Sequence, residues 1–151
     1  MSINSSRVIV TGGYNDHYLS STWMLNLSDF TWSELQDLPG PRIGHGCTTT
    51  AAGEVIIAGG YDGSGQTSSV YIYNLINNTW RQAGDLPAGW NNYFYPVMFL
   101  WNKHPIILEP YSSKIWVLDG TNWKRMEATM GDEFDGAYDT ATTVPAGIFT
   151  C

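Results

Sequence analysis

The sequence repeats itself with a spacing of 47 or 48 residues. A segment of short apolar residues closed by two glycines, RVIVTGGYN at Arg7–Asn15, returns as EVIIAGGYD at Glu54–Asp62. Further along, Ser20–Leu27 matches Ser68–Leu75 and Thr31-Trp32 matches Thr79-Trp80, both 48 residues apart. Several matched segments at one spacing indicate a repeat architecture, in which each unit folds as one supersecondary element and packs on its neighbours.

A third and weaker copy of the unit follows the first two. Its recognisable parts are Pro105–Leu108, Ile115–Asp119 and Asn122-Trp123. The three copies together occupy nearly the whole chain of 151 residues, which is the length of one domain.

Each unit is predicted to consist of β-strands. Val8–Thr11 and Val55–Ala58 are short β-branched runs that end in two glycines, as expected of a buried strand followed by a turn. Asn74–Trp80 is typical of a hairpin, because asparagine tolerates the left-handed conformation that tight turns require. The threonine-rich segment Gly44–Thr50 supplies a further strand. No stretch has helical periodicity, so the predicted class is all-β, with four antiparallel strands in each repeat.

These residues resemble the kelch repeat. The residues that carry the resemblance are the paired glycines and the tryptophans late in each unit: Gly12, Gly13, Gly59, Gly60, Trp32, Trp80 and Trp123. The resemblance implies four-stranded blades of a β-propeller and a non-catalytic module that binds another protein through its loops. Each marked residue also has a purely structural explanation, glycine for positive φ and tryptophan for packing between blades. The third unit departs from the pattern, since Glu109-Pro110 stands where the two glycines belong.

The blades expected from this pattern do not close a ring. Blade one spans 7–36 and lacks its first strand, blade two spans 43–83, blade three spans 93–126, and a terminal strand spans 138–144. Propeller rings usually contain about four to eight blades. Two explanations stay open: the chain is a piece of a longer kelch protein, or two copies form a homodimer in which each terminal strand completes the other copy's first blade in a six-bladed ring.

Composition limits the partners. The chain has 7 basic and 14 acidic residues, a formal charge of −7 and a pI near 4.6. Nucleic acids and anionic membranes require a basic surface, so neither is an expected partner. Apolar runs such as Val97–Trp101 are far too short to cross a bilayer.

The sequence offers no platform for catalysis, for a metal or for a cofactor. Its three histidines, His17, His45 and His104, have no metal-binding spacing and are interpreted as polar loop residues. Asp62–Gly65 lacks the later carboxylates of a calcium loop, and the acidic run Asp132–Asp135 is typical of a solvated loop. We therefore expect no catalytic residue, no metal site and no cofactor.

Five residues are candidates for contact with a protein partner: Arg42, His45, Trp90, Tyr93 and Tyr95. Aromatic residues dominate the energetics of interfaces, although packing between blades explains these rings equally well. The alternative function is a sugar- or metabolite-handling enzyme that uses the central channel, with Arg42, His45 and Glu109 as its ionisable groups. These three residues do not recur from unit to unit, which favours the binding module.

The cellular compartment stays open between cytoplasmic and secreted. The first residues, Met1–Val8, lack the order of a secretory signal. Three glycosylation sequons at Asn4, Asn26 and Asn77 are compatible with secretion. Cys47 and Cys151 are expected to be free thiols, Cys47 buried and Cys151 terminal, and an oxidised pair is the alternative.

Overall fold

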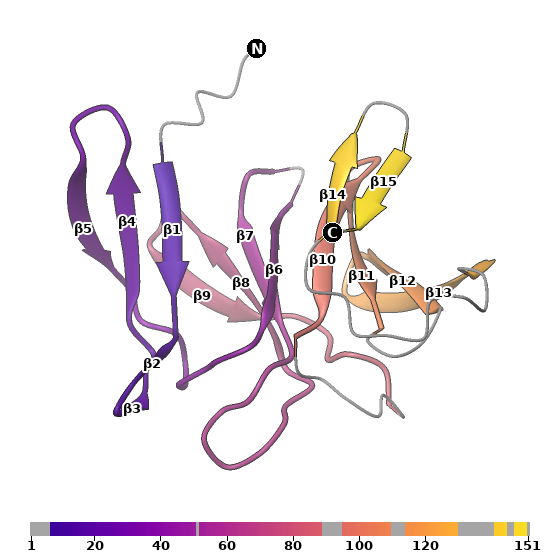
Figure 1. Ribbon diagram of the computed structural model, residues 1–151, viewed down its shortest axis with the longest axis horizontal. Coiled ribbons are helices and arrows are strands. Elements are labelled where there is room, and N and C mark those ends of the chain that lie inside the picture. The colour runs from indigo at the N-terminus through magenta and orange to yellow at the C-terminus, as the bar shows by residue number, and fades with distance from the viewer. Residues whose placement is uncertain are drawn as a thin grey trace.

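The computed structural model describes residues 7–50, 52–88, 95–109, 114–129, 141–144 and 147–150. All regular secondary structure within these ranges is β-strand, and every strand pairing is antiparallel. The strands form three main sheets that stand side by side like the blades of a fan (Figure 1). The predicted all-β class and the incomplete set of kelch-type blades are confirmed.

The first sheet, blade one, has three strands in the order β1-β4-β5. Their bounds are β1 (Arg7–Thr11), β4 (Thr22–Asn26) and β5 (Thr31–Leu35). A very short hairpin, β2 (Tyr14–Asn15) and β3 (His17–Tyr18), extends from the corner after β1 and lies at the lower end of the molecule in Figure 1.

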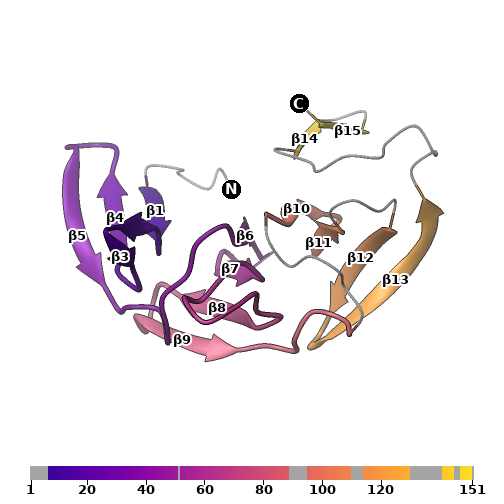
Figure 2. The same ribbon diagram turned by 60° about the horizontal axis from the view of Figure 1, so that its bottom comes forward.

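The second and third sheets, blades two and three, each have four strands in sequence order. Blade two contains β6 (Gly46–Thr49), β7 (Val55–Ala58), β8 (Val70–Asn74) and β9 (Thr79–Gln82). Blade three contains β10 (Val97–Trp101), β11 (His104–Leu108), β12 (Lys114–Asp119) and β13 (Asn122–Thr129). The inner strands β6 and β10 lie beside each other, and the outer strands β9 and β13 form the rim (Figure 2).

The main core lies between blades two and three. Ile56, Val70 and Ile72 of blade two pack with Met98 and Ile107 of blade three, and all five are buried. Directly opposed residues on neighbouring strands share one face of a sheet, so the β-branched pattern of each unit supplies these apolar faces. Burying a side chain of this size contributes about 1.5–3 kcal/mol.

Blades two and three are each joined to the preceding blade by a hydrogen bond from a tryptophan. The indole Nε1–H of Trp80 donates to the backbone oxygen of Gln36 at 2.8 Å, and that of Trp123 donates to the oxygen of Gly84 at 3.1 Å. Gln36 and Gly84 are 48 residues apart and hold equivalent places in successive repeats. This hydrogen bond, called the tryptophan fastening below, therefore recurs at both junctions between blades.

The face of blade one that points away from blade two is exposed. Val8, Val10 and Trp32 on this face have 41%, 48% and 53% of their surface accessible. Their equivalents in blade two, Val55, Ile57 and Trp80, are partly or fully buried. The difference arises because blade one itself covers that side of blade two, whereas no sheet covers blade one among the described residues.

Cys47 is a free and exposed thiol, which corrects the expectation that it is buried. It pairs with Ile57 and so lies on the face of blade two that is turned toward blade one. Blade one has no strand inside β1 in the described part of the chain, so no strand covers this position of β6. Cys151 lies outside the described residues.

The terminal strand expected at 138–144 is described from Ala141 and is paired. Strand β14 (Ala141–Val144) forms a hairpin with β15 (Gly147–Thr150), with Val144 opposite Gly147. The sequence predicts no strand after this one, but β15 follows it. Because β14 lies beside β10, it continues the row of inner strands made by β6 and β10.

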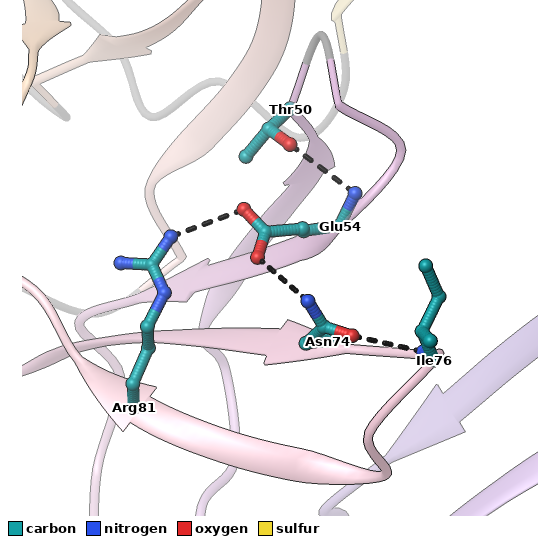
Figure 3. A network of polar contacts seen from close by, with 5 residues as sticks. All are labelled: Thr50, Glu54, Asn74, Ile76 and Arg81. Carbon is teal, nitrogen blue, oxygen red and sulfur yellow. Dashed lines mark hydrogen bonds and ion pairs between the residues drawn. The ribbon is translucent and has the colours of Figure 1, made fainter.

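A polar network at the upper end of Figure 1 ties the hairpins of blade two together (Figure 3). The Glu54 carboxylate accepts hydrogen bonds from Asn74 Nδ2 at 3.4 Å and from an Arg81 guanidinium nitrogen at 3.0 Å. The Glu54 backbone N–H donates to Thr50 Oγ1, and the Ile76 N–H donates to Asn74 Oδ1. Arg81 is more than half exposed, so this ion pair contributes little to stability.

Candidate functional site

The segment between β5 of blade one and β6 of blade two is called the linking segment. It runs between the paired-glycine turns of the two blades, Gly12-Gly13 and Gly59-Gly60, which are called the glycine corners. The backbone oxygen of Arg42 accepts the Gly13 N–H at 2.8 Å, and Ile43 exchanges two backbone hydrogen bonds with Tyr61. A Cβ atom on Gly12 would lie 2.3 Å from Arg42 O, and one on Gly60 would lie 2.4 Å from Ile43 O. The paired glycines are thus required by this close passage as well as by their positive φ angles.

Arg42 is buried and bound to the backbone of blade two. One guanidinium nitrogen donates to the oxygens of Gly59 and Ser69, both at 3.1 Å, and the other donates to Ser69 Oγ at 2.8 Å. The guanidinium carbon lies 5.2 Å from the centre of the Tyr71 ring. Burial lowers the pKa of Arg42, yet the group stays protonated because its ordinary pKa is so high. The structure thus places this candidate contact residue inside the junction.

His45 stands next to this arrangement, and its Nδ1 atom is buried with no hydrogen-bond partner among the described residues. Burial, assisted by the charge of Arg42, lowers the pKa of His45 from 6.5 to about 4. The imidazole is therefore neutral at neutral pH. Its Cε1 atom would lie 3.3 Å from a Cβ on Gly12, so His45 packs against the glycine corner of blade one.

The buried His45 predicts a loss of stability in mild acid. The unfolded chain binds a proton on this imidazole near pH 6.5, whereas the folded chain binds it only near pH 4. Unfolding therefore takes up a proton between these values, and the free energy of unfolding falls by up to about 3 kcal/mol as the pH drops from 7 to 4. Urea denaturation at several pH values, followed by tryptophan fluorescence, measures this loss.

Two variants separate His45 from the other acid-titrating groups. His45→Gln should flatten the curve between pH 6.5 and 4, whereas His17→Gln, on an exposed position of β3, should keep the wild-type slope. An unchanged slope in His45→Gln would contradict the assignment. The ionised carboxylates of Asp29, Asp62 and Asp119 also contribute stability that is lost in acid. Their pKa values are lowered below 3.8, so this loss occurs at a lower pH than the loss from His45.

Glu109 takes the place of the first glycine in the third repeat, and its side chain is buried. Its carboxylate accepts hydrogen bonds from Lys114 Nζ at 3.4 Å and from Trp116 Nε1 at 3.3 Å. Its backbone N–H donates to Lys114 O, and its φ angle is not positive. At this position the third blade has a buried carboxylate bound by a lysine and a tryptophan, where the first two blades have glycine.

Three exposed aromatic side chains, Tyr14, Tyr18 and Tyr95, lie near the linking segment, at the end of the blades that carries the β2–β3 hairpin. The exposed rings of Trp23, Phe30, Trp32 and Trp101 lie on other parts of the blades. Tyr14 is 63% and Tyr95 is 61% exposed, and Tyr95 is attached there by a hydrogen bond from its N–H to Gly44 O. The rings of Tyr14 and Tyr18 are in contact, as are those of Tyr18 and Tyr61. Of the predicted contact residues, Arg42 and His45 lie together beneath this end and Tyr95 lies at its surface. Trp90 and Tyr93 lie outside the described residues.

Tyr14, Tyr18 and Tyr61 are not among the five candidate contact residues that the sequence offers. A signal was available, since Tyr14 and Tyr18 stand four residues apart in a loop with only polar residues between them. Two rings that flank such a tight turn are brought together by the hairpin.

Neither a metal centre nor a membrane span is found in the part of the chain that the structure describes. No group of three or more histidine, cysteine, aspartate or glutamate side chains is gathered closely enough there to hold a metal ion. Likewise, none of those residues forms a helix of the length and apolarity needed to cross a membrane.

The stacked antiparallel blades, the glycine corners and the tryptophan fastenings define a partial β-propeller of four-stranded repeats. The family model of the kelch motif matches residues 4–39 and 41–87, which is more than half of the sequence. The chain belongs to the kelch repeat family, whose members generally act as scaffolds for protein interaction. No curated protein matches the chain.

Proposed function

We propose that this chain is a non-catalytic module that binds a protein partner at the end of the blades formed by β2–β3, the β7–β8 loop and the residues around Tyr95. The observation that carries the proposal is the set of exposed rings at this end, held on a fixed framework. Loops positioned by a rigid scaffold commonly carry binding function, and exposed aromatic rings are efficient anchors at interfaces.

The ionisable groups that an enzyme would use have other tasks in this fold. Arg42 is bound to blade two, Glu109 is bound by Lys114 and Trp116, and burial keeps His45 neutral. Arg42 and His45 therefore serve the proposed surface from beneath, by fixing the linking segment. Tyr95, with Trp90 and Tyr93 as further predicted contacts, serves it directly.

Photo-crosslinking tests the proposal. A photoreactive phenylalanine analogue is placed at Tyr14 or Tyr95, at the proposed end, and at Phe30 or Ile76 as controls. Phe30 and Ile76 are 75% and 92% exposed in the hairpin turns β4–β5 and β8–β9 at the opposite end of the blades. In extracts of the source cells, a discrete protein adduct is expected from the first pair only. Equal adducts from both pairs, or none from either, would contradict the proposal.

The homodimer with a shared six-bladed ring stays a prediction. For β14 to complete the first blade of another copy, it would have to pair with β1 of that copy. In the structure β14 is already paired with β15, so the exchange would require this hairpin to open or β14 to use its second edge.

A further inference from the structure

The three tyrosines at the lower end form one continuous surface across blades one and two. We call Tyr14, Tyr18 and Tyr61, together with the carboxylates of Asp16 and Asp62, the tyrosine patch. The ring centres of Tyr14 and Tyr18 are 5.3 Å apart with the planes at 66°, and those of Tyr18 and Tyr61 are 5.4 Å apart at 40°. The first two tyrosines come from the β2–β3 hairpin and the third from the corner after β7.

The patch has a fixed shape. Tyr14 and Tyr18 are directly opposed in the hairpin, and Tyr61 is held by its two backbone hydrogen bonds to Ile43. Gly63 lies so close that a Cβ atom there would be 3.2 Å from Tyr18 Cδ2. Despite this support the rings stay accessible, Tyr14 at 63% and Tyr18 at 36%. A ligand would therefore meet ordered rings and would not have to order them at its own cost.

Two acidic residues adjoin the tyrosines of the patch in the sequence. Asp16 is exposed at the turn between β2 and β3, and Asp62 follows Tyr61 directly. Ser64 Oγ and the N–H groups of Ser64 and Gly65 all donate to Asp62 Oδ1, which keeps its pKa low and its carboxylate ionised. Neither 14–18 nor 61–66 contains a lysine or arginine, and the neighbouring Arg42 is buried and already bonded.

Rings beside carboxylates suit a guanidinium group. An arginine can lie over a tyrosine face and donate hydrogen bonds to a carboxylate at the same time. The chain already contains the first of these two contacts, since the Arg42 guanidinium carbon lies 5.2 Å from the centre of the Tyr71 ring. The inclined rings of the patch form a corner and not the flat platform on which a sugar ring stacks. The formal charge of −7 also favours approach of a basic segment.

From this geometry we infer that the tyrosine patch binds an arginine-bearing segment of a protein partner. The inference rests on the proposed function and adds the chemistry of the partner. It assigns Tyr14 and Tyr18 to stacking with a guanidinium group and Asp16 to a charge-assisted hydrogen bond with it.

Peptide titration followed by NMR tests the inference with the full chain labelled with nitrogen-15. The probe is the acetylated peptide Gly-Ser-Arg-Pro-Arg-Ser-Gly, and the matched control replaces both arginines with citrulline, which keeps the shape and removes the charge. We expect the arginine peptide to shift the amide signals of 14–18 and 61–65 and the citrulline peptide to leave them in place. Equal shifts with both peptides would overturn the inference, as would shifts of these signals by chitotriose alone.

Variants test the assigned contacts. A cation over an exposed ring is worth about a two- to fivefold change in affinity, so Tyr14→Ala should raise the dissociation constant by about threefold. An exposed charge pair is worth somewhat less, so Asp16→Asn should raise it by about twofold. Ile76→Ala, at the opposite end of blade two, should leave it unchanged. No effect from either patch variant would overturn the inference.

The outcome also separates this inference from the proposed function. Peptide shifts confined to other residues, or no shifts at all, would remove the arginine-binding patch. The photo-crosslinking result from Tyr95 would still stand, because it does not depend on which partner chemistry the patch accepts.

Discussion

The variant Gly60→Ala is expected to lower the free energy of unfolding by about 3 kcal/mol. Gly60 has a φ angle of +91°, which costs an alanine about 1 kcal/mol. The added Cβ would also lie 2.4 Å from Ile43 O and 2.9 Å from His45 N, and backbone atoms cannot swing aside as a side chain does. Making room would strain or open the two hydrogen bonds between Ile43 and Tyr61, a further cost of about 1–3 kcal/mol.

Gly53→Ala is the matched control for this variant. Gly53 also has a positive φ angle, +79°, but an added Cβ would meet no atom within 4 Å. It should therefore show only the conformational cost of about 1 kcal/mol. Urea denaturation followed by tryptophan fluorescence measures both variants. Equal losses would show that the linking segment does not press on the glycine corner.

The variant Arg42→Met is expected to destabilise the fold by about 3 kcal/mol. Methionine fills part of the space but leaves the oxygen of Gly59 without the guanidinium that now donates to it, while the oxygen of Ser69 keeps only the Gly59 N–H as a donor. A buried acceptor that loses its partner costs about 1–3 kcal/mol, and the contact with Tyr71 is lost as well. The stability of Arg42→Lys should lie between that of the wild type and that of Arg42→Met. An ammonium group keeps the charge but cannot reproduce the fork that reaches both Ser69 O and Ser69 Oγ.

Arg81→Met provides the comparison for a surface arginine. Arg81 is more than half exposed and pairs with Glu54 at 3.0 Å (Figure 3), so its replacement should cost less than about 1 kcal/mol. Thermal unfolding and urea denaturation of the three variants give the order of their stabilities. If Arg42→Met were as stable as Arg81→Met, the buried guanidinium would not be what joins the linking segment to blade two.

Local sequence was sufficient to predict the sheets and the glycine corners. Short β-branched runs that end in two glycines predict a strand followed by a turn with positive φ. Strands β1 and β7 precede such turns, and Gly12 and Gly60 have the expected positive φ angles. Repetition added what a single run cannot give, because matched segments at one spacing imply stacked equivalent units.

The environment of particular side chains could not be predicted in the same way. Whether Arg42 is buried depends on how the linking segment passes between two blades, and this is a long-range property of the fold. The exposure of Cys47 depends on the strand arrangement of the preceding blade, which the residues around Cys47 do not encode. Strand β15 was not predicted from the sequence, because its hairpin with β14 depends on pairing between the two segments.

The tryptophan fastening has a consequence for how such chains change over generations. The donor at Trp80 and the acceptor at Gly84 lie in the same repeat, the first directed to the blade before and the second to the blade after. A duplicated stretch of DNA that encodes one repeat therefore brings both halves of the bond and can be inserted between existing copies without compensating changes elsewhere. Blade number can then change by copying alone, because each added repeat brings both a donor and an acceptor.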